Sequence, residues 1–356
     1  MTSEIRIRHD LLAAFSQSLF EGAGVSREKA LLLADSLVAG SLRGVDSHGV
    51  QLIPRYIERM ECGDIDIQAQ GRVVSESGCV LVYDGEHGIG QVISAICCDH
   101  AIRLARPSGI GMVVARESSH FGAAAYWAQR FSSAGLIGIV MCNASSSIAP
   151  WQGREPRVGT NPICMSVPSR GGGAWLLDMA TTTVAWGKIY KAVYAGEKTI
   201  PAGWAMDRNG VPTTDTMVAL GGLVMPLGGY KGSGLAAMVE ILCGVLGGGG
   251  MVTDLGGIAT VGRRLRTSQM FLAIEVSRFL PLEVFEQRIT RLVQELKSSK
   301  PAAGYDEVLV AGDPEWRAEA ERLQHGVPVE YGVWKHLVSL AERFNVPLPE
   351  AMESPG

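Results

Sequence analysis

The chain has almost no excess of charge of either sign and few aromatic residues. Its 32 lysines and arginines nearly balance 36 aspartates and glutamates, which gives a net charge of −4, and aromatic residues make up 6%. Without a basic surplus, we expect no nucleic-acid partner. Hydrophobic residues still reach 47% of the 356 positions, which predicts a folded chain with an ample core. The length allows one large domain or two to three smaller ones.

Signals for export and for disulfides are also missing. The seven cysteines are an odd number with no C-x-x-C pair, so we expect buried free thiols and a reducing cytoplasm. Residues 1–6 lack the apolar stretch of a secretory signal. Gly234 to Val252 approaches the hydropathy of a membrane span, but it contains Glu240 and four consecutive glycines at 247–250. This segment therefore favours a buried core helix, and we expect no membrane partner.

Motifs of several common enzyme classes are absent. The chain has no H-E-x-x-H motif, no cluster of histidine and carboxylate at ligand spacing and no G-x-S-x-G, so we expect neither a metal site nor a hydrolase. Gly232 to Ala237 matches G-x-G-x-x-A, but the later Asp254 does not end a second strand. A Rossmann site is therefore a minor alternative. Glycines 228–234 and Lys231 could hold a phosphate at a helix start, with a tight turn before a core helix as the alternative.

Hydrophobic periodicity predicts helices first and a mixed sheet later. The first 65 residues are predicted to be helical, with helices ending near residues 22 and 44 and a third from about 50 to 60. Further on we expect strands at 80–83, 110–115, 136–142, 162–167, 175–178 and 270–276, helices at 92–105 and 123–131, and helices opening at Pro281 and Asp313. Because two of these strands follow one another without a helix between them, the sheet should include antiparallel pairs.

Two histidines are each set in a short polar turn with glycine, Ser47-His48-Gly49 and Ser119-His120-Phe121-Gly122. Each turn follows a predicted helix or strand, so the imidazole can reach a cleft. Histidine is the side chain best suited to exchange a proton near neutral pH. A single histidine of this kind is more often structural than catalytic. The pair, together with Pro226 to Gly232, points to a redox enzyme.

A carboxylate marks a third turn. Asp178 ends a predicted strand and opens the polar turn Asp178-Met179-Ala180-Thr181. Turns at strand ends are frequent places for ligand contacts. Asp178 could bind a ribose hydroxyl or the nicotinamide amide, and a capping role is the alternative.

The chain resembles the type-2 malate/L-lactate dehydrogenases, nicotinamide-dependent oxidoreductases unrelated to the Rossmann lactate dehydrogenases. The resemblance covers nearly the whole chain and rests on matched segments at Arg43 to Val50, Pro54 to Tyr56, Ser118 to Gly122, Gly159 to Pro162, Asp178 to Thr181, Gly187-Lys188 and Pro226 to Gly232. It implies an α+β, non-Rossmann fold with a mixed, largely antiparallel sheet, a helical domain, a homodimer, and NAD or NADP as cofactor. We expect a helical domain over 1–72, joined by C-terminal helices of 314–356, and a sheet domain over 73–313.

The resemblance also implies roles for single residues. Ser47, His48, His120 and Lys188 belong to the expected catalytic group, and either His48 or His120 would exchange the proton. The expected substrate contacts are Leu52, Arg55, Tyr56 and Thr160. The expected cofactor contacts are His120, Phe121, Gly122, Asp178, Met179, Ala180, Tyr230, Lys231, Gly312 and Asp313.

Two positions depart from the family pattern. Many members carry an arginine four residues after the first histidine, where it can grip the substrate carboxylate, but this chain has Leu52. Arg55 or another group must then serve, and the apolar residue admits a bulkier, aryl-lactate-like substrate. Position 188, an aspartate in the imino-acid reductases of the family, is Lys188, which argues against cyclic imines.

We therefore expect a cytoplasmic NAD(P)-dependent enzyme that interconverts a 2-hydroxy acid and a 2-oxo acid, malate- or lactate-like or bulkier. The alternatives are a relative acting on a cyclic imino acid or a sugar-derived keto acid, and a catalytically idle ligand-binding protein with the same fold.

Overall fold

A mixed sheet forms the centre of the structure, a computed structural model that describes residues 4–170 and 175–352. Its seven strands within the described residues lie in the order β2-β3-β4-β11-β5-β6-β7. Their bounds are Arg72–Ser77, Val80–Asp84, Ile110–Ser118, Thr267–Glu275, Leu136–Cys142, Ile163–Ser166 and Leu176–Met179 in that order. The β3–β4 pair is parallel, and the other five neighbouring pairs are antiparallel. This confirms the expected mixed, largely antiparallel sheet.

The two faces of this sheet are covered differently. Helices α4 (Gly90–Ser108) and α5 (Ala124–Ser133) cover one face, where Trp127, Phe131 and Phe271 are fully buried. The other face packs against α8 (Tyr230–Glu240) and the π-helical turn η3 (Ile241–Val245). The expectation that residues 234–252 form a buried core helix is wrong in part, because Ile241 and Val245 on the far side of this segment are 57% and 54% exposed.

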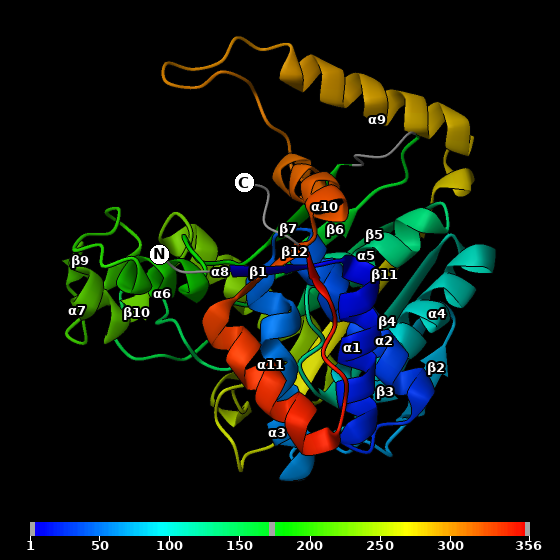
Figure 1. Ribbon diagram of the computed structural model, residues 1–356. Coiled ribbons are helices and arrows are strands. Elements are labelled where there is room, and N and C mark those ends of the chain that lie inside the picture. The colour runs from blue at the N-terminus through cyan, green and yellow to red at the C-terminus, as the bar shows by residue number, and fades with distance from the viewer. Residues whose placement is uncertain (1–3, 171–174, 353–356) are drawn as a thin grey trace.

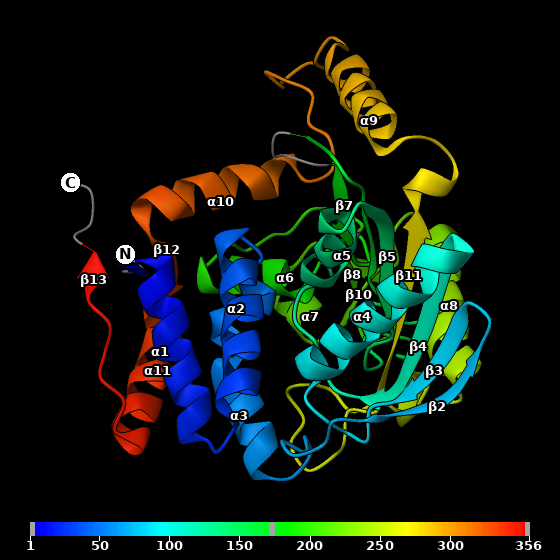
Figure 2. The same cartoon turned by 90° about the vertical axis from the view of Figure 1, so that its right-hand side faces the viewer.

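A helical layer packs beside the sheet and includes both ends of the described chain (Figure 2). Helices α1 (His9–Gly22), α2 (Arg27–Leu42) and α3 (Ile53–Glu61) share one apolar core with α11 (Tyr331–Phe344). The prediction of an all-helical N-terminus is wrong at its start. Strand β1 (Glu4–Ile7) pairs with β12 (Val327–Glu330) and β13 (Ala351–Met352), and partners so distant in sequence leave no local signal.

A small lobe projects from the opposite side of the sheet domain, at the left of Figure 1. It contains α6 (Trp186–Tyr194), α7 (Thr216–Leu220) and the short strands β8 (Ala205–Met206), β9 (Pro212–Thr213) and β10 (Leu223–Val224). Ile189, Ala205 and Val224 form part of its own apolar cluster. The lobe contributes the start of α6 to the region around Ser47, because a Cβ on Gly187 would lie 3.7 Å from the Ser47 Cβ.

Helix α9 (Leu282–Lys297) stands away from the rest of the chain in both ribbon views, whereas α10 (Asp313–His325) lies along the helical layer (Figures 1 and 2). The expected apolar face of α9 is present, with Leu282, Phe285, Ile289, Leu292 and Leu296. None of the residues of α9 is buried. Among the described helices, none is long and apolar enough to cross a membrane.

Candidate functional site

Two imidazoles lie face to face where the helical layer meets the carboxyl end of β4. His48 ends the 3₁₀ turn η1 (Asp46–His48), and His120 follows the last residue of β4, Ser118, by two positions. The ring centroids are 5.5 Å apart, and the ring planes differ by 21°. The structure thus brings together the two histidines that the sequence singled out.

Two glycines allow this approach. A Cβ on residue 40 of α2 would lie 2.9 Å from the carbonyl oxygen of His48, and a Cβ on residue 90 of α4 would lie 2.3 Å from that of His120. Real Cβ atoms essentially never come closer than 3.0 Å to another heavy atom. Both helices therefore pack against the histidine turns at a distance that requires glycine.

His48 is paired with a hydroxyl group. The Ser47 Oγ lies 2.9 Å from the His48 Nδ1. A hydroxyl can donate or accept a hydrogen bond, so Ser47 can pair with either neutral tautomer and with the protonated ring. Burial lowers the pKa of His48 below its usual value. The ring is then neutral near pH 7, and its Nε2 atom is the one able to exchange a proton with a ligand.

His120 is held by a different set of partners. Its Nδ1 lies 2.5 Å from the Tyr56 Oη and accepts a hydrogen bond from the Gly122 N–H over 3.3 Å. Since Nδ1 acts as an acceptor, the proton of the neutral ring is on Nε2. Burial, with a smaller contribution from His48, lowers the pKa of His120 to about 3. This imidazole is therefore a neutral hydrogen-bond donor over the physiological pH range.

Two residues assigned to ligand contacts lie behind His120 instead. Tyr56 was expected to touch substrate, but it is 0% exposed and its hydroxyl group points to His120. Phe121 was expected to touch the cofactor, but it is 3% exposed and stacks on Trp127 at 6.4 Å between centroids. Side chains with so little accessible surface have almost no area to offer a ligand. Both residues instead fix the turn that carries His120.

Three predicted ligand-binding segments are joined through their backbones. The Thr181 N–H donates to the Thr160 carbonyl oxygen over 2.9 Å, and the Leu227 N–H donates to the Thr181 carbonyl oxygen over 3.0 Å. Thr160, Met179 and Ala180 all keep part of their surface open. The segments that contain Thr160, Asp178 to Thr181 and Pro226 to Gly232 therefore form one continuous wall.

A buried carboxylate fastens this wall to α8. Glu240 is 5% exposed and accepts hydrogen bonds from the side-chain amides of Asn143 and Asn161, at 3.2 and 3.1 Å. Asn161 follows Thr160 directly. These amides explain why an acidic residue occurs within an apolar segment, since a buried carboxylate needs hydrogen-bond donors.

Asp178 belongs to β7 and lies next to the start of α5. Its Oδ2 accepts a hydrogen bond from the Ala125 N–H over 2.9 Å, which is the capping contact weighed from the sequence. The residue keeps exposed surface, yet the loss of hydration around its carboxyl group raises the pKa of that group to about 6, against the opposing effects of the Ala125 N–H and Arg43. One carboxylate oxygen thus supports the helix, and the residue still has surface that a ligand can reach.

Arg43 was not assigned a role from the sequence, although it opens one of the matched segments. It is 6% exposed, its guanidinium carbon lies 4.1 Å from the centroid of the Trp316 ring, and its Nη1 lies 3.4 Å from a carboxylate oxygen of Glu319. Among the described residues, its Nε and Nη2 atoms have no hydrogen-bond partner. Burial lowers the pKa of Arg43, with Glu319, Glu315 and Asp178 acting against this effect.

Other expected site residues have varied surroundings. Lys188 is exposed in the first turn of α6, next to the glycine that approaches Ser47. Leu52 is partly buried against the core of the helical layer. Arg55 lies on the solvent side of α3, where it forms an ion pair with Glu58 at 2.9 Å. The geometry therefore gives no sign that Arg55 replaces the missing arginine.

The remaining expected cofactor residues lie outside the imidazole pair. Tyr230 is 63% exposed and stands edge to face with Trp151, and the neighbouring Lys231 is also exposed. Gly312 caps α10 with a left-handed backbone. Asp313 accepts hydrogen bonds from the Val310 N–H and Lys297, each within 2.9 Å. The structure itself does not connect these residues to either histidine.

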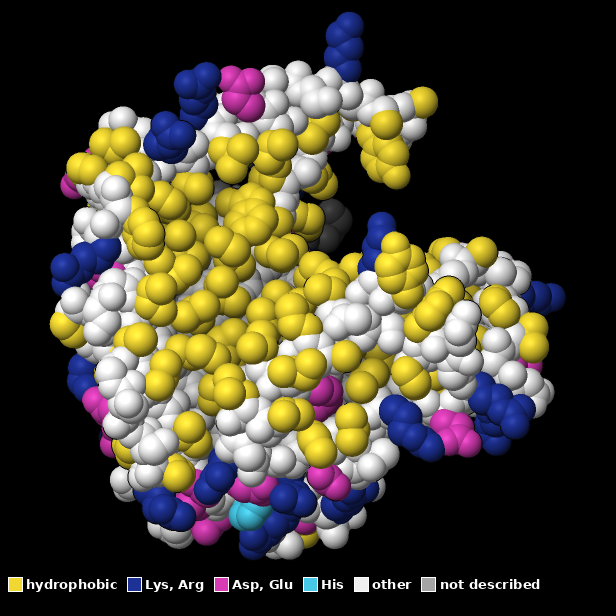
Figure 3. All heavy atoms as spheres, turned by 180° about the vertical axis from the view of Figure 1, so that it is seen from behind, with side chains coloured by type: hydrophobic (Ala, Val, Ile, Leu, Met, Phe, Trp, Pro, Cys, Tyr) yellow, Lys and Arg dark blue, Asp and Glu magenta, His cyan; other side chains and the backbone are white. Residues whose placement is uncertain are grey.

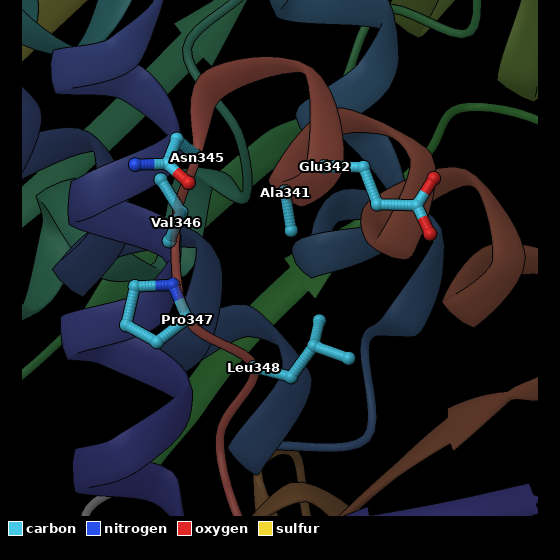
Figure 4. Close-up of a pocket in the computed structure, with 6 residues that line it drawn as sticks. All are labelled: Ala341, Glu342, Asn345, Val346, Pro347 and Leu348. Atoms are coloured by element: carbon cyan, nitrogen blue, oxygen red, sulfur yellow. The ribbon is translucent and has the colours of Figure 1, made fainter.

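Two surface cavities lie away from the imidazole pair. One, of about 260 Å³, lies at the end of α11 (Figure 4). It is lined by Ala341, Glu342, Asn345, Val346, Pro347 and Leu348. The other, of about 400 Å³, lies along residues 304–309. Over residues 4–170 and 175–352, no three histidine, cysteine or acidic side chains gather as they would around a metal ion.

The residues beside the imidazoles can be compared with what a nicotinamide cofactor needs. Gly122 has φ +77°, and a Cβ built on it would have no neighbour closer than 3.9 Å. A Cβ there would make ordinary van der Waals contacts with Gln91 and His48, so the backbone beside both imidazoles is not crowded. Asp178, Met179 and Ala180 supply polar and backbone groups at the other end of the wall. The residues present are compatible with a nicotinamide nucleotide.

Comparison with known proteins identifies the family. The sequence profile described as malate/L-lactate dehydrogenase matches residues 7–338. The chain belongs to the malate/L-lactate dehydrogenase family. It is 36% identical over 351 residues to the malate dehydrogenase of Pyrococcus horikoshii, covering 96% of each chain. The solved structure of that enzyme superposes with a TM-score of 0.89 over 97% of each chain.

Other relatives in this family have different names. The chain is 34% identical to the L-sulfolactate dehydrogenase of Methanocaldococcus jannaschii, over 93% of this chain and 94% of that protein. It is 31% identical to the ureidoglycolate dehydrogenase (NAD(+)) of Escherichia coli, over 94% of this chain and 95% of that protein. The protein is therefore an oxidoreductase that interconverts a hydroxy acid and an oxo acid with a nicotinamide cofactor, and the expected non-Rossmann fold is confirmed.

Proposed function

We propose that His48 exchanges the proton with the substrate oxygen and that His120 stays neutral beside it. The observation that carries this proposal is the pair of stacked imidazoles with different partners at Nδ1. When bound, the nicotinamide cofactor supplies or accepts the hydride at the substrate carbon. Asp178, Met179 and Ala180 would hold the cofactor along the wall, and the backbone of Gly122, which carries no side chain, would border its ring.

The different partners assign different roles. During oxidation of a hydroxy acid, the Nε2 of His48 accepts the hydroxyl proton, and its Nδ1–H then donates to the Ser47 Oγ. The reverse transfer protonates the oxygen during reduction. Protonation of His120 would place a hydrogen on Nδ1, where the Gly122 N–H already points. His120 therefore contributes a Nε2–H donor toward the developing charge on the substrate oxygen.

We propose that the substrate is a 2-hydroxy or 2-oxo acid with a large apolar side chain. Leu52 stands where a cationic clamp is expected, and Arg55 is already paired with Glu58. Without that clamp, a substrate with a second acidic group loses its best partner, whereas an aryl or branched alkyl group gains an apolar contact. Thr160 and Lys188 would contact the carboxylate next to the reacting carbon.

An assay with paired substrates tests this proposal. The enzyme is mixed with NADH or NADPH and with phenylpyruvate, pyruvate, oxaloacetate or sulfopyruvate, and cofactor oxidation is followed at 340 nm. We expect kcat/KM for phenylpyruvate to exceed that for oxaloacetate at least about tenfold, since one lost charge contact costs 1–3 kcal/mol. The ratio for the two cofactors decides between NAD and NADP. Faster turnover of oxaloacetate would refute the substrate class, and no turnover of any of the four would favour an idle ligand-binding protein.

We also propose a homodimer. The exposed side of α8 and η3 is a stripe at helical spacing that contains Tyr230, Ala237, Ile241 and Val245. A broad field of hydrophobic side chains covers the face of the molecule opposite to that of Figure 1 (Figure 3). The unburied amphipathic helix α9 projects on the same chain. Patches of this extent usually mark a subunit contact.

Sedimentation measures this association. We expect the wild-type mass to be twice the 37.9 kDa of one chain and Ile241→Glu to shift it toward the monomer. Leu31→Glu is the matched control, because Leu31 is 56% exposed on α2, outside the stripe. A monomeric wild type, or a dimer that Ile241→Glu leaves intact, would contradict the proposal.

We place the protein in the cytoplasm. Its seven cysteines are free thiols, and Cys97, Cys98, Cys142, Cys164 and Cys243 are buried. Unpaired buried thiols are typical of proteins kept in a reducing compartment.

A further inference from the structure

A single arginine links the C-terminal part of the chain to the turn that carries His48. Arg322, on α10, forms a bidentate ion pair with Asp46, with Nη1–Oδ1 at 2.5 Å and Nη2–Oδ2 at 3.0 Å. The same Nη1 donates to the carbonyl oxygen of Ser41, at the end of α2. The guanidinium therefore joins the last turn of α2 to the first residue of η1.

More of α10 packs on the same segment. Trp316 and Glu319 contact Arg43, and a Cβ on Gly44 would lie 3.1 Å from the Cβ of Ala318. Residues 316, 319 and 322 are three apart and share one side of the helix. This side of α10 therefore braces residues 41–46, which directly precede Ser47 and His48.

The turn η1 has little internal support. It is three residues long, and its backbone hydrogen bonds run from the His48 N–H to Val45 and from the Gly49 N–H to Asp46. Each of its residues keeps part of its surface exposed, although the imidazole of His48 is largely withdrawn from solvent. A short 3₁₀ turn with no fully buried residue depends on outside contacts for its position. The side chain of Arg322 is only 14% exposed and that of Asp46 is 47% exposed, so the pair is shielded from solvent on the arginine side.

We propose that Arg322 is a positioning residue for the reaction, acting through Asp46 on Ser47 and His48. This proposal rests on the role proposed above for His48. The planar guanidinium contacts both oxygens of Asp46 and a carbonyl oxygen at once, and a lysine ammonium group cannot reproduce this fork. Loss of the fork would let the turn shift by a fraction of an ångström. Displacements near 1 Å at a reacting group cost up to about 100-fold in rate.

Arg322→Met is the principal test, and Arg317→Met is its matched control. Arg317 lies on the same helix and forms a bidentate ion pair with Glu307, at 2.5 and 2.6 Å, away from η1. We expect Arg322→Met to lower kcat about 10- to 100-fold with KM within about threefold, because the lost interaction acts in the transition state. Arg322→Met should also lose more thermal stability than Arg317→Met, whose ion pair is exposed, so kcat is compared at a temperature at which both variants are fully folded. Equal kcat values for the two variants would overturn the proposal.

Asp46→Asn keeps the test valid if Arg322→Met does not fold. The amide preserves the shape of the side chain and removes the charge that the fork recognises. We expect a kcat loss similar in size to that of Arg322→Met, a partial loss in Arg322→Lys, and little further loss when Asp46→Asn and Arg322→Met are combined. Independent, additive losses would mean that the pair does not act as a unit.

An NMR titration separates this proposal from the proposed function. The protein is labelled with ¹³C-histidine, and the His48 signal is identified as the one missing from the spectrum of His48→Asn. The measurement needs no substrate. We expect Arg322→Met to move the titration of His48 toward the ordinary histidine value, because a loosened turn admits water, and Arg317→Met to leave it unchanged. An unchanged titration together with a reduced kcat would refute positioning through the turn. If the titration of His48 moves but the protein turns over no substrate, the proposed function is refuted, while the positioning of the His48 turn by Arg322 still holds.

Discussion

The two histidine turns differ in how each imidazole is supported. His48 has a hydroxyl partner on the neighbouring residue and lies on a turn held from outside by Arg322. His120 has a fully buried phenol and a backbone N–H as partners, on a turn pressed against Gly90. The Ser47 hydroxyl can donate or accept a hydrogen bond at His48, whereas the Gly122 N–H can only donate one to the Nδ1 of His120.

This difference indicates a division of work. An imidazole that must gain and lose a proton needs a partner that tolerates both states, and Ser47 is such a partner. An imidazole that must remain a neutral donor needs a partner that fixes one tautomer, and the Gly122 N–H does this because it can only donate to Nδ1. Two imidazoles in similar surroundings can therefore have different chemical roles when their Nδ1 atoms have different hydrogen-bond partners.

Replacing each histidine by asparagine puts this division to the sharpest test. We expect His48→Asn to lower kcat about 1,000-fold, because the proton carrier is lost, and His120→Asn to lower it about tenfold, because the amide can still donate a hydrogen bond. Cofactor affinity, measured by fluorescence titration with NADH or NADPH, should change far less in His48→Asn than turnover does. Equal losses in kcat for the two variants would show that the rings share the proton transfer. Near-native turnover of His48→Asn would exclude His48 as the proton carrier.

Acid stability gives a smaller effect that sharpens the same comparison. Both rings have a lowered pKa in the folded protein, that of His120 to about 3. Below the ordinary histidine pKa near 6.5, the unfolded chain binds protons that the folded chain does not, so the free energy of unfolding should fall as the pH drops from 6.5. Each ring contributes a slope of at most about 1.4 kcal/mol per pH unit. Above pH 7 neither ring contributes to the pH dependence of the free energy of unfolding.

Urea unfolding between pH 7.5 and 5 measures this slope. His120→Asn should reduce it, whereas the control His336→Asn, at an exposed position of α11, should leave it unchanged. A slope that His120→Asn does not alter would mean that this ring takes up protons in the folded protein, contrary to its proposed role.

Much of the sheet domain could be predicted from the sequence. Strand β5 covers Leu136–Cys142 as expected, and α4, α5, β3, β4 and β11 differ from their predicted ranges only at the ends. These elements have long apolar patterns at one period, so the local signal is strong. The paired histidine turns could be found for a similar reason, because glycine and polar residues interrupt such patterns.

Other features depended on partners distant in sequence. Strand β1 needs β12 and β13, and Asp46 needs Arg322 on α10, so no window of neighbouring residues could reveal either. The burial of residues 234–252 was overestimated because hydropathy does not distinguish a core face from an exposed apolar stripe. Tyr56 was placed at the substrate by resemblance, and only the fold shows that its hydroxyl group faces His120.

The small sheet that brings residues 4–7 beside residues 351–352 has a practical consequence. Ile7 lies opposite Ala351, and Arg6 lies opposite Met352, in the register of β1 and β13. Chain ends that lie side by side can be connected by a short linker, and new ends can be opened in an exposed loop elsewhere. A circularly permuted enzyme opened near the exposed Gly304 would keep both histidine turns in one uninterrupted polypeptide.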